Sequence, residues 1–205
     1  MFLFRSCMQS TQVLCGSFDD NAIQTGVSDT IIVKQKSGSF RSTPFLICFG
    51  PYHQTHNHIQ INVIVNDKNI ADVHFGLDSR GYVEPRYLTD KQIKKLNLNF
   101  GMNKVSYRLE GFTIESEIYL FADNDKLVVS DVDGTATKSD IMGNVNNFFN
   151  KEYLHDGYSQ LLKKVHLNGY KVVWLTMRSL PLYSFSKNYL REHCGIDAPI
   201  LMEPE

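Results

Sequence analysis

Residues 126–135 read KLVVSDVDGT, and this stretch decides the fold of the carboxyl-terminal part of the chain. The continuous apolar run Leu127-Val128-Val129 is typical of a parallel strand that is buried on both faces. In a parallel sheet, ligands bind beyond the carboxyl ends of the strands. We therefore expect the carboxylates of Asp131 and Asp133, which follow the run directly, to lie in a binding crevice.

Helical and strand patterns alternate after this first strand. Helical spacing of apolar residues predicts helices at 158–166 and 184–193, and apolar runs predict strands at 172–175 and 199–202. The order strand, helix, strand, helix predicts a doubly wound parallel sheet.

The residue types from Asp131 to Thr135 suit phosphoryl transfer. An aspartate carboxylate such as Asp131 can take up a phosphoryl group as an aspartyl-phosphate. Asp133 lies two residues further, where it can protonate the leaving oxygen and later accept a proton from water. Gly134 lets the backbone approach a phosphate, and Thr135 offers a hydroxyl and an amide. Because nucleophile and substrate are both anionic, we expect Mg²⁺ between them, held by Asp131 and Asp133.

Two further candidates follow the second predicted strand. The hydroxyl of Thr176 can bind a phosphoryl oxygen, and Arg178 can add positive charge there. For Arg178, the role of an ordinary surface arginine at a helix start is equally open. An Asp-Gly pair alone is common in turns, so the position of Asp131 directly after an apolar strand carries most of the argument.

Residues 28–125 have a different pattern of apolar and polar residues. Short apolar or alternating stretches are separated by turns such as Asn66-Asp67, and Thr89 or Asp90 can cap a short helix that ends near Leu96. Closely spaced strands of this kind predict an antiparallel β-sandwich. The predicted strands are residues 31–33, 45–49, 59–65, 70–75, 105–109 and 114–121.

Composition excludes several functional classes. The formal net charge is −1, so a broad basic surface for nucleic acid is not expected. The four cysteines are scattered without a CxxC pair, which argues against a disulfide framework and a structural zinc site. No apolar run approaches the length of about 20 residues that a helix needs to span a bilayer. For residues 1–27, a segment resting on a membrane and a frayed terminus are equally open.

The arrangement of Asp131, Asp133 and Thr176 resembles the haloacid dehalogenase superfamily of phosphatases. The resemblance implies that Asp131 is the nucleophile, that Asp133 is the acid and base, and that Thr176 binds phosphate. Within this superfamily, residues 131–140, DVDGTATKSD, are similar to the catalytic signature of the lipins, the magnesium-dependent phosphatidate phosphatases.

Other stretches resemble the lipins in the same order. Gly81 falls where the amino-terminal lipin block has a functionally important glycine. The similar stretches are residues 29–50, 72–81, 88–107, 155–157, 168–171 and 189–190. The resemblance implies an immunoglobulin-like sandwich at 28–125 joined to a haloacid-dehalogenase-like Rossmann domain at 126–205.

The lipin resemblance also implies a function and a location. It implies hydrolysis of phosphatidate to diacylglycerol and phosphate in lipid biosynthesis, at the cytoplasmic side of the endoplasmic reticulum or nuclear membrane. The superfamily needs a later lysine and a later acidic residue, and the sequence ends at Glu205, so we expect an incomplete catalytic domain. A lipin-like membrane or interaction module without activity, and a phosphatase of soluble metabolites, remain alternatives. The sequence leaves the oligomeric state open.

Overall fold

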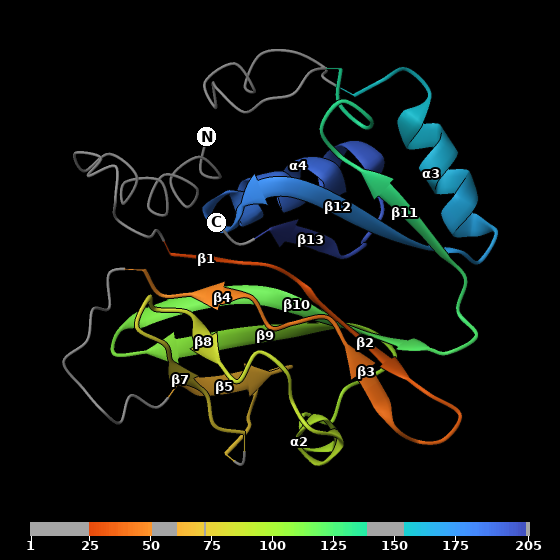
Figure 1. Ribbon diagram of the computed structural model, residues 1–205. Coiled ribbons are helices and arrows are strands. Elements are labelled where there is room, and N and C mark those ends of the chain that lie inside the picture. The colour runs from red at the N-terminus through yellow and green to blue at the C-terminus, as the bar shows by residue number, and fades with distance from the viewer. Residues whose placement is uncertain (1–24, 51–60, 72, 139–153, 204–205) are drawn as a thin grey trace, which may run out of the picture.

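The computed structural model is built mostly of β-sheet, with few helices (Figure 1). Its described part forms a six-stranded sheet, a three-stranded sheet and two small two-stranded sheets. The segment predicted at residues 1–27 lies outside the described part up to residue 24. The structure describes residues 25–50, 61–71, 73–138 and 154–203.

The six-stranded sheet has the strand order β3-β2-β10-β9-β5-β6. Its strands are β2 (Thr30–Lys34), β3 (Phe40–Ser42), β5 (Asn62–Val65), β6 (Lys68–Asn69), β9 (Gly101–Leu109) and β10 (Phe112–Ala122). Neighbouring strands pair antiparallel, as predicted, except that β2 and β10 pair in parallel. Strands in parallel cannot be joined by a tight hairpin, so local sequence patterns do not reveal such a pair.

The small sheets pair β1 (Gly26–Val27) with β4 (Ile47–Cys48) and β7 (Gly76–Leu77) with β8 (Val83–Glu84). The strand predicted at residues 70–75 is wrong. Of the described residues in this stretch, Phe75 alone forms a bridge, to Ile61. Val73 and Phe75 are both buried in the core, so their alternation reflects packing rather than strand pairing.

Two local predictions in the β part are confirmed. Helix α2 (Asp90–Lys95) begins after Thr89, whose side chain forms a capping box with Gln92. Asn66 and Asp67 link β5 to β6 with φ angles of 47° and 64°, the left-handed values that a two-residue hairpin turn requires.

The three-stranded sheet contains β11 (Leu127–Asp131), β12 (Lys171–Ser179) and β13 (Ile200–Glu203), all parallel as predicted. Its helices are α3 (Tyr158–Leu167), α4 (Tyr183–Cys194) and the short 3₁₀ helix η3 (Leu180–Leu182). Helices α3 and α4 contact each other and pack with Trp174, whereas Val173 on the opposite face packs against Ile31 and Tyr119 of the larger sheet. Helices α3 and α4 therefore lie on one face of the sheet, and the described residues do not show the doubly wound arrangement with a helix on each face.

Strand β11 is less buried than its sequence predicts. Leu127 is 46% exposed and Val129 is 60% exposed. The strand lies at the edge of its sheet, and within the described ranges the larger sheet covers Val173 but not these side chains. The prediction of burial on both faces is therefore wrong for β11.

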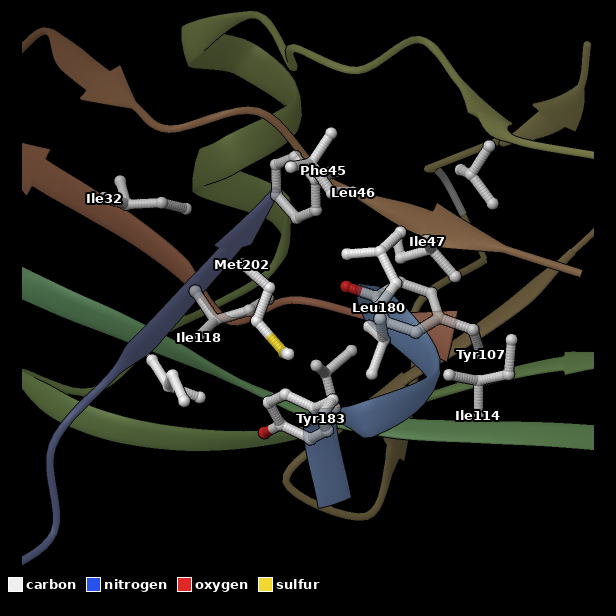
Figure 2. Close-up of a cluster of buried hydrophobic side chains, with 14 of the residues drawn as sticks. Ile32, Phe45, Leu46, Ile47, Tyr107, Ile114, Ile118, Leu180, Tyr183 and Met202 are labelled. Atoms are coloured by element: carbon white, nitrogen blue, oxygen red, sulfur yellow. The ribbon is translucent and has the colours of Figure 1, made fainter. Parts of the chain in front are cut away.

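Side chains from the two main sheets meet in one core (Figure 2). Figure 2 shows Tyr107 and Ile118 of the larger sheet close to Leu180 of η3 and Met202 of β13. At Gly26, an added Cβ would lie 2.4 Å from the carbonyl carbon of Leu180, so the close approach of β1 to η3 requires glycine. The core thus continues across the domain boundary predicted between residues 125 and 126.

A cluster of charged side chains is buried where the two parts meet. Asp29 precedes β2, and Lys187 Nζ of α4 lies 2.5 Å from its Oδ2. Lys187 Nζ also lies 2.8 Å from Glu117 Oε2 on β10, and the Tyr183 hydroxyl donates to Asp29 Oδ1 at 2.5 Å. The backbone amide of Ile200 donates to Asp29 Oδ2 at 2.9 Å. The cluster therefore ties the amino-terminal part of the chain to α4 and β13.

The pKa values of the two carboxyl groups in this cluster shift in opposite directions. Burial raises the pKa of Asp29, although Lys187 opposes the shift. Burial also acts to raise the pKa of Glu117, but Lys187, a hydrogen bond from Tyr119 and the charge of Arg191 outweigh it, so this pKa is lowered. A carboxyl group with a lowered pKa stabilises the fold while it is ionised, above the pKa that it has in the unfolded chain.

We expect Glu117→Gln to make the stability of the protein less sensitive to acid. In the unchanged chain, the contribution of Glu117 is present above its ordinary pKa of 4.5 and is lost as the pH falls through the lower pKa of the folded state. Urea unfolding between about pH 7 and about pH 3 should therefore show a steeper loss of unfolding free energy for the unchanged chain. Asp29 remains ionisable in both proteins, so its opposite contribution is present in both profiles. Equal acid dependence would contradict this role.

Candidate active site

Asp131 ends β11 at the carboxyl edge of the parallel sheet. Its side chain is exposed, and the Thr135 hydroxyl donates to its Oδ2 at 3.1 Å. Val132 is fully buried and donates from its amide to a carbonyl of β12 at 3.1 Å. The chain then folds back, because the Ala136 amide donates to the Val132 carbonyl at 3.0 Å and Gly134 adopts a φ of 76°. Buried anchors therefore hold a loop that leaves Asp131 open to solvent.

The carboxylate of Asp133 is held by side chains of β12. The Thr176 hydroxyl donates to Asp133 Oδ2 at 2.7 Å. Arg178 donates to Asp133 Oδ1 from Nε at 3.0 Å and from Nη2 at 2.6 Å. Thr176 and Arg178 stand two residues apart, so their side chains lie on the same face of the strand. The Arg178 side chain is 6% exposed, so water screens this ion pair less than it would a surface pair.

The structure therefore brings together the ends of β11 and β12, which the sequence predicts to lie at the same edge of the sheet. Asp133 after β11 meets Thr176 and Arg178 on β12, which lie 43 and 45 residues further along the sequence. Arg178 is buried, so the alternative of an ordinary surface arginine is wrong. Its guanidinium lies against a carboxylate, and its contact with phosphate stays a prediction, as do the phosphate contacts of Gly134, Thr135 and Thr176.

Ser186 belongs to the site but was not among the residues predicted for it. Its hydroxyl accepts a hydrogen bond from Arg178 Nη1 at 3.0 Å, and the residue is fully buried. The available signal is a serine four residues before Leu190 on the predicted helix 184–193, which places it on the buried side. Helical spacing shows which side is buried but not which strand residue the serine meets.

Gly81 lies in the β part, in the turn between β7 and β8. Its φ is 82°, and its amide donates to the Asp78 carbonyl at 3.0 Å. Its own carbonyl accepts from the Phe49 amide at 2.8 Å, and an added Cβ would lie 3.4 Å from the Gly50 nitrogen. The positive φ and the close contact with Gly50 explain why this position is glycine. Gly81 thus has a structural role in this turn and does not lie beside Asp131 and Asp133.

The two aspartates differ in how well they suit Mg²⁺, a cation that prefers oxygen ligands. The exposed carboxylate of Asp131 fits, because the Thr135 hydroxyl occupies one side of a single oxygen. Both oxygens of Asp133 accept hydrogen bonds from Arg178, and Oδ2 also accepts one from Thr176. The geometry therefore suits Asp131 as a side-chain ligand and does not suit Asp133, which was predicted as a second one.

Comparison with known proteins finds matches over both parts of the chain. Residues 85–205 match the family LNS2 (Lipin/Ned1/Smp2), and residues 1–99 match the lipin N-terminal conserved region. Among solved structures, extracellular domains 3–5 of Drosophila OTK share 12% identity over 58% of this chain and 42% of that chain. Their TM-score of 0.24 is too low to inform the fold.

Curated relatives match the chain over part of their own length. Phosphatidate phosphatase LPIN3 of Mus musculus is 40% identical over 139 residues, which are 60% of this chain and 16% of that protein. Nuclear elongation and deformation protein 1 of Schizosaccharomyces pombe is 34% identical over 60% of this chain and 20% of its own. Phosphatidic acid phosphohydrolase 1 of Saccharomyces cerevisiae is 32% identical over 63% of this chain and 16% of its own. Because the LNS2 match covers more than half of the sequence, this chain belongs to the lipin family.

Proposed function

We propose that the chain hydrolyses phosphatidate to diacylglycerol and phosphate through an aspartyl-phosphate. One observation carries the proposal: an exposed Asp131 ends β11, and Asp133 two residues later is held by Thr176 and Arg178. This is the arrangement that a carboxylate nucleophile with a neighbouring acid and base requires. The lipid substrate is supported by relatives whose names are phosphatidate phosphatase and phosphatidic acid phosphohydrolase.

The proposed reaction has two steps. An oxygen of Asp131 attacks phosphorus, and the bond from phosphorus to the diacylglycerol oxygen breaks while Asp133 donates its proton to that oxygen. Water then attacks the phosphorus of the aspartyl-phosphate, and the bond from phosphorus to the Asp131 oxygen breaks, which restores the carboxylate. Asp133 takes a proton from the attacking water, and phosphate leaves. The backbone amides at Gly134 and Thr135 hold the phosphoryl oxygens during both steps. Thr176 would join them when its hydroxyl, which donates its one proton to Asp133 in this structure, turns toward the substrate.

Mg²⁺ is the proposed cofactor. When bound, it offsets the repulsion between an anionic nucleophile and an anionic phosphate. Asp131 would hold it, because its carboxylate is the open one. Asp133 is not proposed as a ligand, because its oxygens accept hydrogen bonds from Arg178 and Thr176.

Phosphate release by the purified chain tests the proposal. Phosphatidate in detergent micelles is compared with p-nitrophenyl phosphate and glycerol 3-phosphate, each with Mg²⁺ and with a chelator. We expect release from phosphatidate that requires Mg²⁺. Release from the soluble esters alone would instead identify a phosphatase of soluble metabolites. A folded chain that releases phosphate from none of them would contradict a catalytic function.

A second candidate function is a lipin-like module that binds a membrane without hydrolysis. One observation favours it: of the two aspartates predicted to hold Mg²⁺, Asp131 has an open carboxylate, whereas both oxygens of Asp133 accept hydrogen bonds from other side chains. Such a module would sediment with phosphatidate vesicles and release no phosphate, with or without Mg²⁺. Vesicle sedimentation run beside the phosphate assay separates the two candidates.

The finer fold and location are part of the same proposal. We infer an immunoglobulin-like sandwich for the β part and a haloacid-dehalogenase-like Rossmann domain for the α/β part, supported by the parallel order β11-β12-β13. Because phosphatidate resides in membranes, the proposed partner is a phosphatidate-containing surface of the endoplasmic reticulum or nuclear membrane. Among the described residues, no helix has the length and apolar character to cross a membrane.

A further inference from the structure

The contact between Arg178 and Asp133 fixes the orientation of this carboxylate. Arg178 donates from Nε at 3.0 Å and from Nη2 at 2.6 Å to Oδ1, and Nε also lies 3.1 Å from Oδ2. Because a guanidinium is planar and rigid, bonding through two of its nitrogens sets the plane of the carboxylate as well as its position. A lysine ammonium would supply the charge without this control of geometry.

Arg178 is itself held by two elements. Its Nη1 donates to the hydroxyl of the fully buried Ser186 on α4 at 3.0 Å. Its backbone amide donates to the hydroxyl oxygen of Thr176 at 3.2 Å, and that hydroxyl donates in turn to Asp133. The side chain cannot turn toward solvent without breaking several of these buried bonds. Its charge is therefore directed at Asp133 rather than outward.

We propose that Arg178 is a positioning residue that holds Asp133 where it can donate a proton to the leaving diacylglycerol oxygen and accept one from water. This inference rests on the proposed function, in which Asp133 is the acid and the base. Proton transfer requires the two groups to lie within hydrogen-bond reach, and a displacement of about 1 Å can cost about 100-fold in rate. The guanidinium stays protonated throughout, so it can orient Asp133 in both steps.

Arg178→Lys tests the inference through the leaving group. Diacylglycerol leaves as an alkoxide that needs a proton, whereas p-nitrophenolate is stable without one. We expect first-turnover release of the leaving group to fall about 100-fold for phosphatidate and less than about 10-fold for p-nitrophenyl phosphate, with KM nearly unchanged. Equal losses on both substrates, or a raised KM with unchanged kcat, would overturn the inference. The second result would identify a phosphate-binding arginine instead.

Two variants control this experiment. Ser186→Ala frees one side of the Arg178 guanidinium but keeps its contact with Asp133, so it should show a smaller loss with the same dependence on the leaving group. It decides the question if Arg178→Lys does not fold. Arg191→Lys is the matched control, because the Arg191 guanidinium also lies 2.6 Å from a carboxylate, that of Glu117, outside the site. Arg191→Lys should leave the ratio of the release rates from phosphatidate and p-nitrophenyl phosphate unchanged.

The experiment separates this inference from the function on which it rests. If the unchanged chain releases no leaving group, the proposed function and the inference both fail. If it does release one and Arg178→Lys is as fast on phosphatidate, the inference alone fails.

Discussion

Asp131→Asn is expected to abolish phosphate release from phosphatidate while the fold stays intact. An amide cannot replace the carboxylate as nucleophile, so we expect a loss of at least about 1,000-fold in kcat. The side chain of Asp131 is exposed, and an asparagine oxygen can accept the same hydrogen bond from Thr135. The free energy of unfolding should therefore change by no more than about 0.5 kcal/mol. Phosphate release and urea unfolding, measured on the same preparation, check both parts.

Asp156→Asn is the matched control for this result. Asp156 is also an exposed aspartate of the α/β part, with a side chain 99% exposed and 3.2 Å from Lys138 Nζ. It should retain activity and stability, because an exposed ion pair contributes little. An Asp131→Asn protein that keeps more than about a tenth of the rate would refute the nucleophile assignment.

Lys187→Met is expected to destabilise the protein by about 3–5 kcal/mol, the cost of leaving buried charge without its partner. Lys187 is 3% exposed and lies within ion-pair distance of both Asp29 and Glu117. Methionine keeps the length and the apolar stem of lysine, so lost packing adds little. Urea unfolding at neutral pH measures the loss, and a cost below about 1 kcal/mol would show that the cluster does not hold the two parts together.

The double variant Asp29→Asn/Lys187→Met identifies the cause. It removes the buried acid together with its cation, so part of the lost stability should return. A double variant less stable than Lys187→Met alone would point to the hydrogen bonds of Asp29 with Tyr183 and Ile200 instead. Lys164→Met, at an exposed lysine of α3, should change stability by no more than about 0.5 kcal/mol.

Features set by a few adjacent residues could be predicted from the sequence. The helix cap at Thr89 and the turn at Asn66-Asp67 both depend on neighbours within one turn of the chain. The parallel pairing of β2 with β10 and the exposure of β11 depend on elements far away in sequence. Local periodicity contains no information about which distant strand or helix covers a face, so both were missed.

The same division applies to the candidate site. Strand ends of a parallel sheet share one edge, which explains why Asp133 and Thr176 could be predicted as neighbours. The partner of Arg178 could not be predicted from the sequence, because an arginine at a strand end can bind a phosphate as well as a carboxylate. The burial of Arg178 and its contact with Ser186 on α4 decide between these partners, and both arise from tertiary packing.

The buried pair of Asp29 and Lys187 also constrains how the chain can evolve. The two positions are 158 residues apart, and each is tolerable in the core only while the other carries the opposite charge. A neutral substitution at one position should persist in a lineage only after a compensating change at the other. Across the family, these two positions should therefore covary. The lipin N-terminal conserved region, which contains Asp29, and the LNS2 region, which contains Lys187, should then be inherited together.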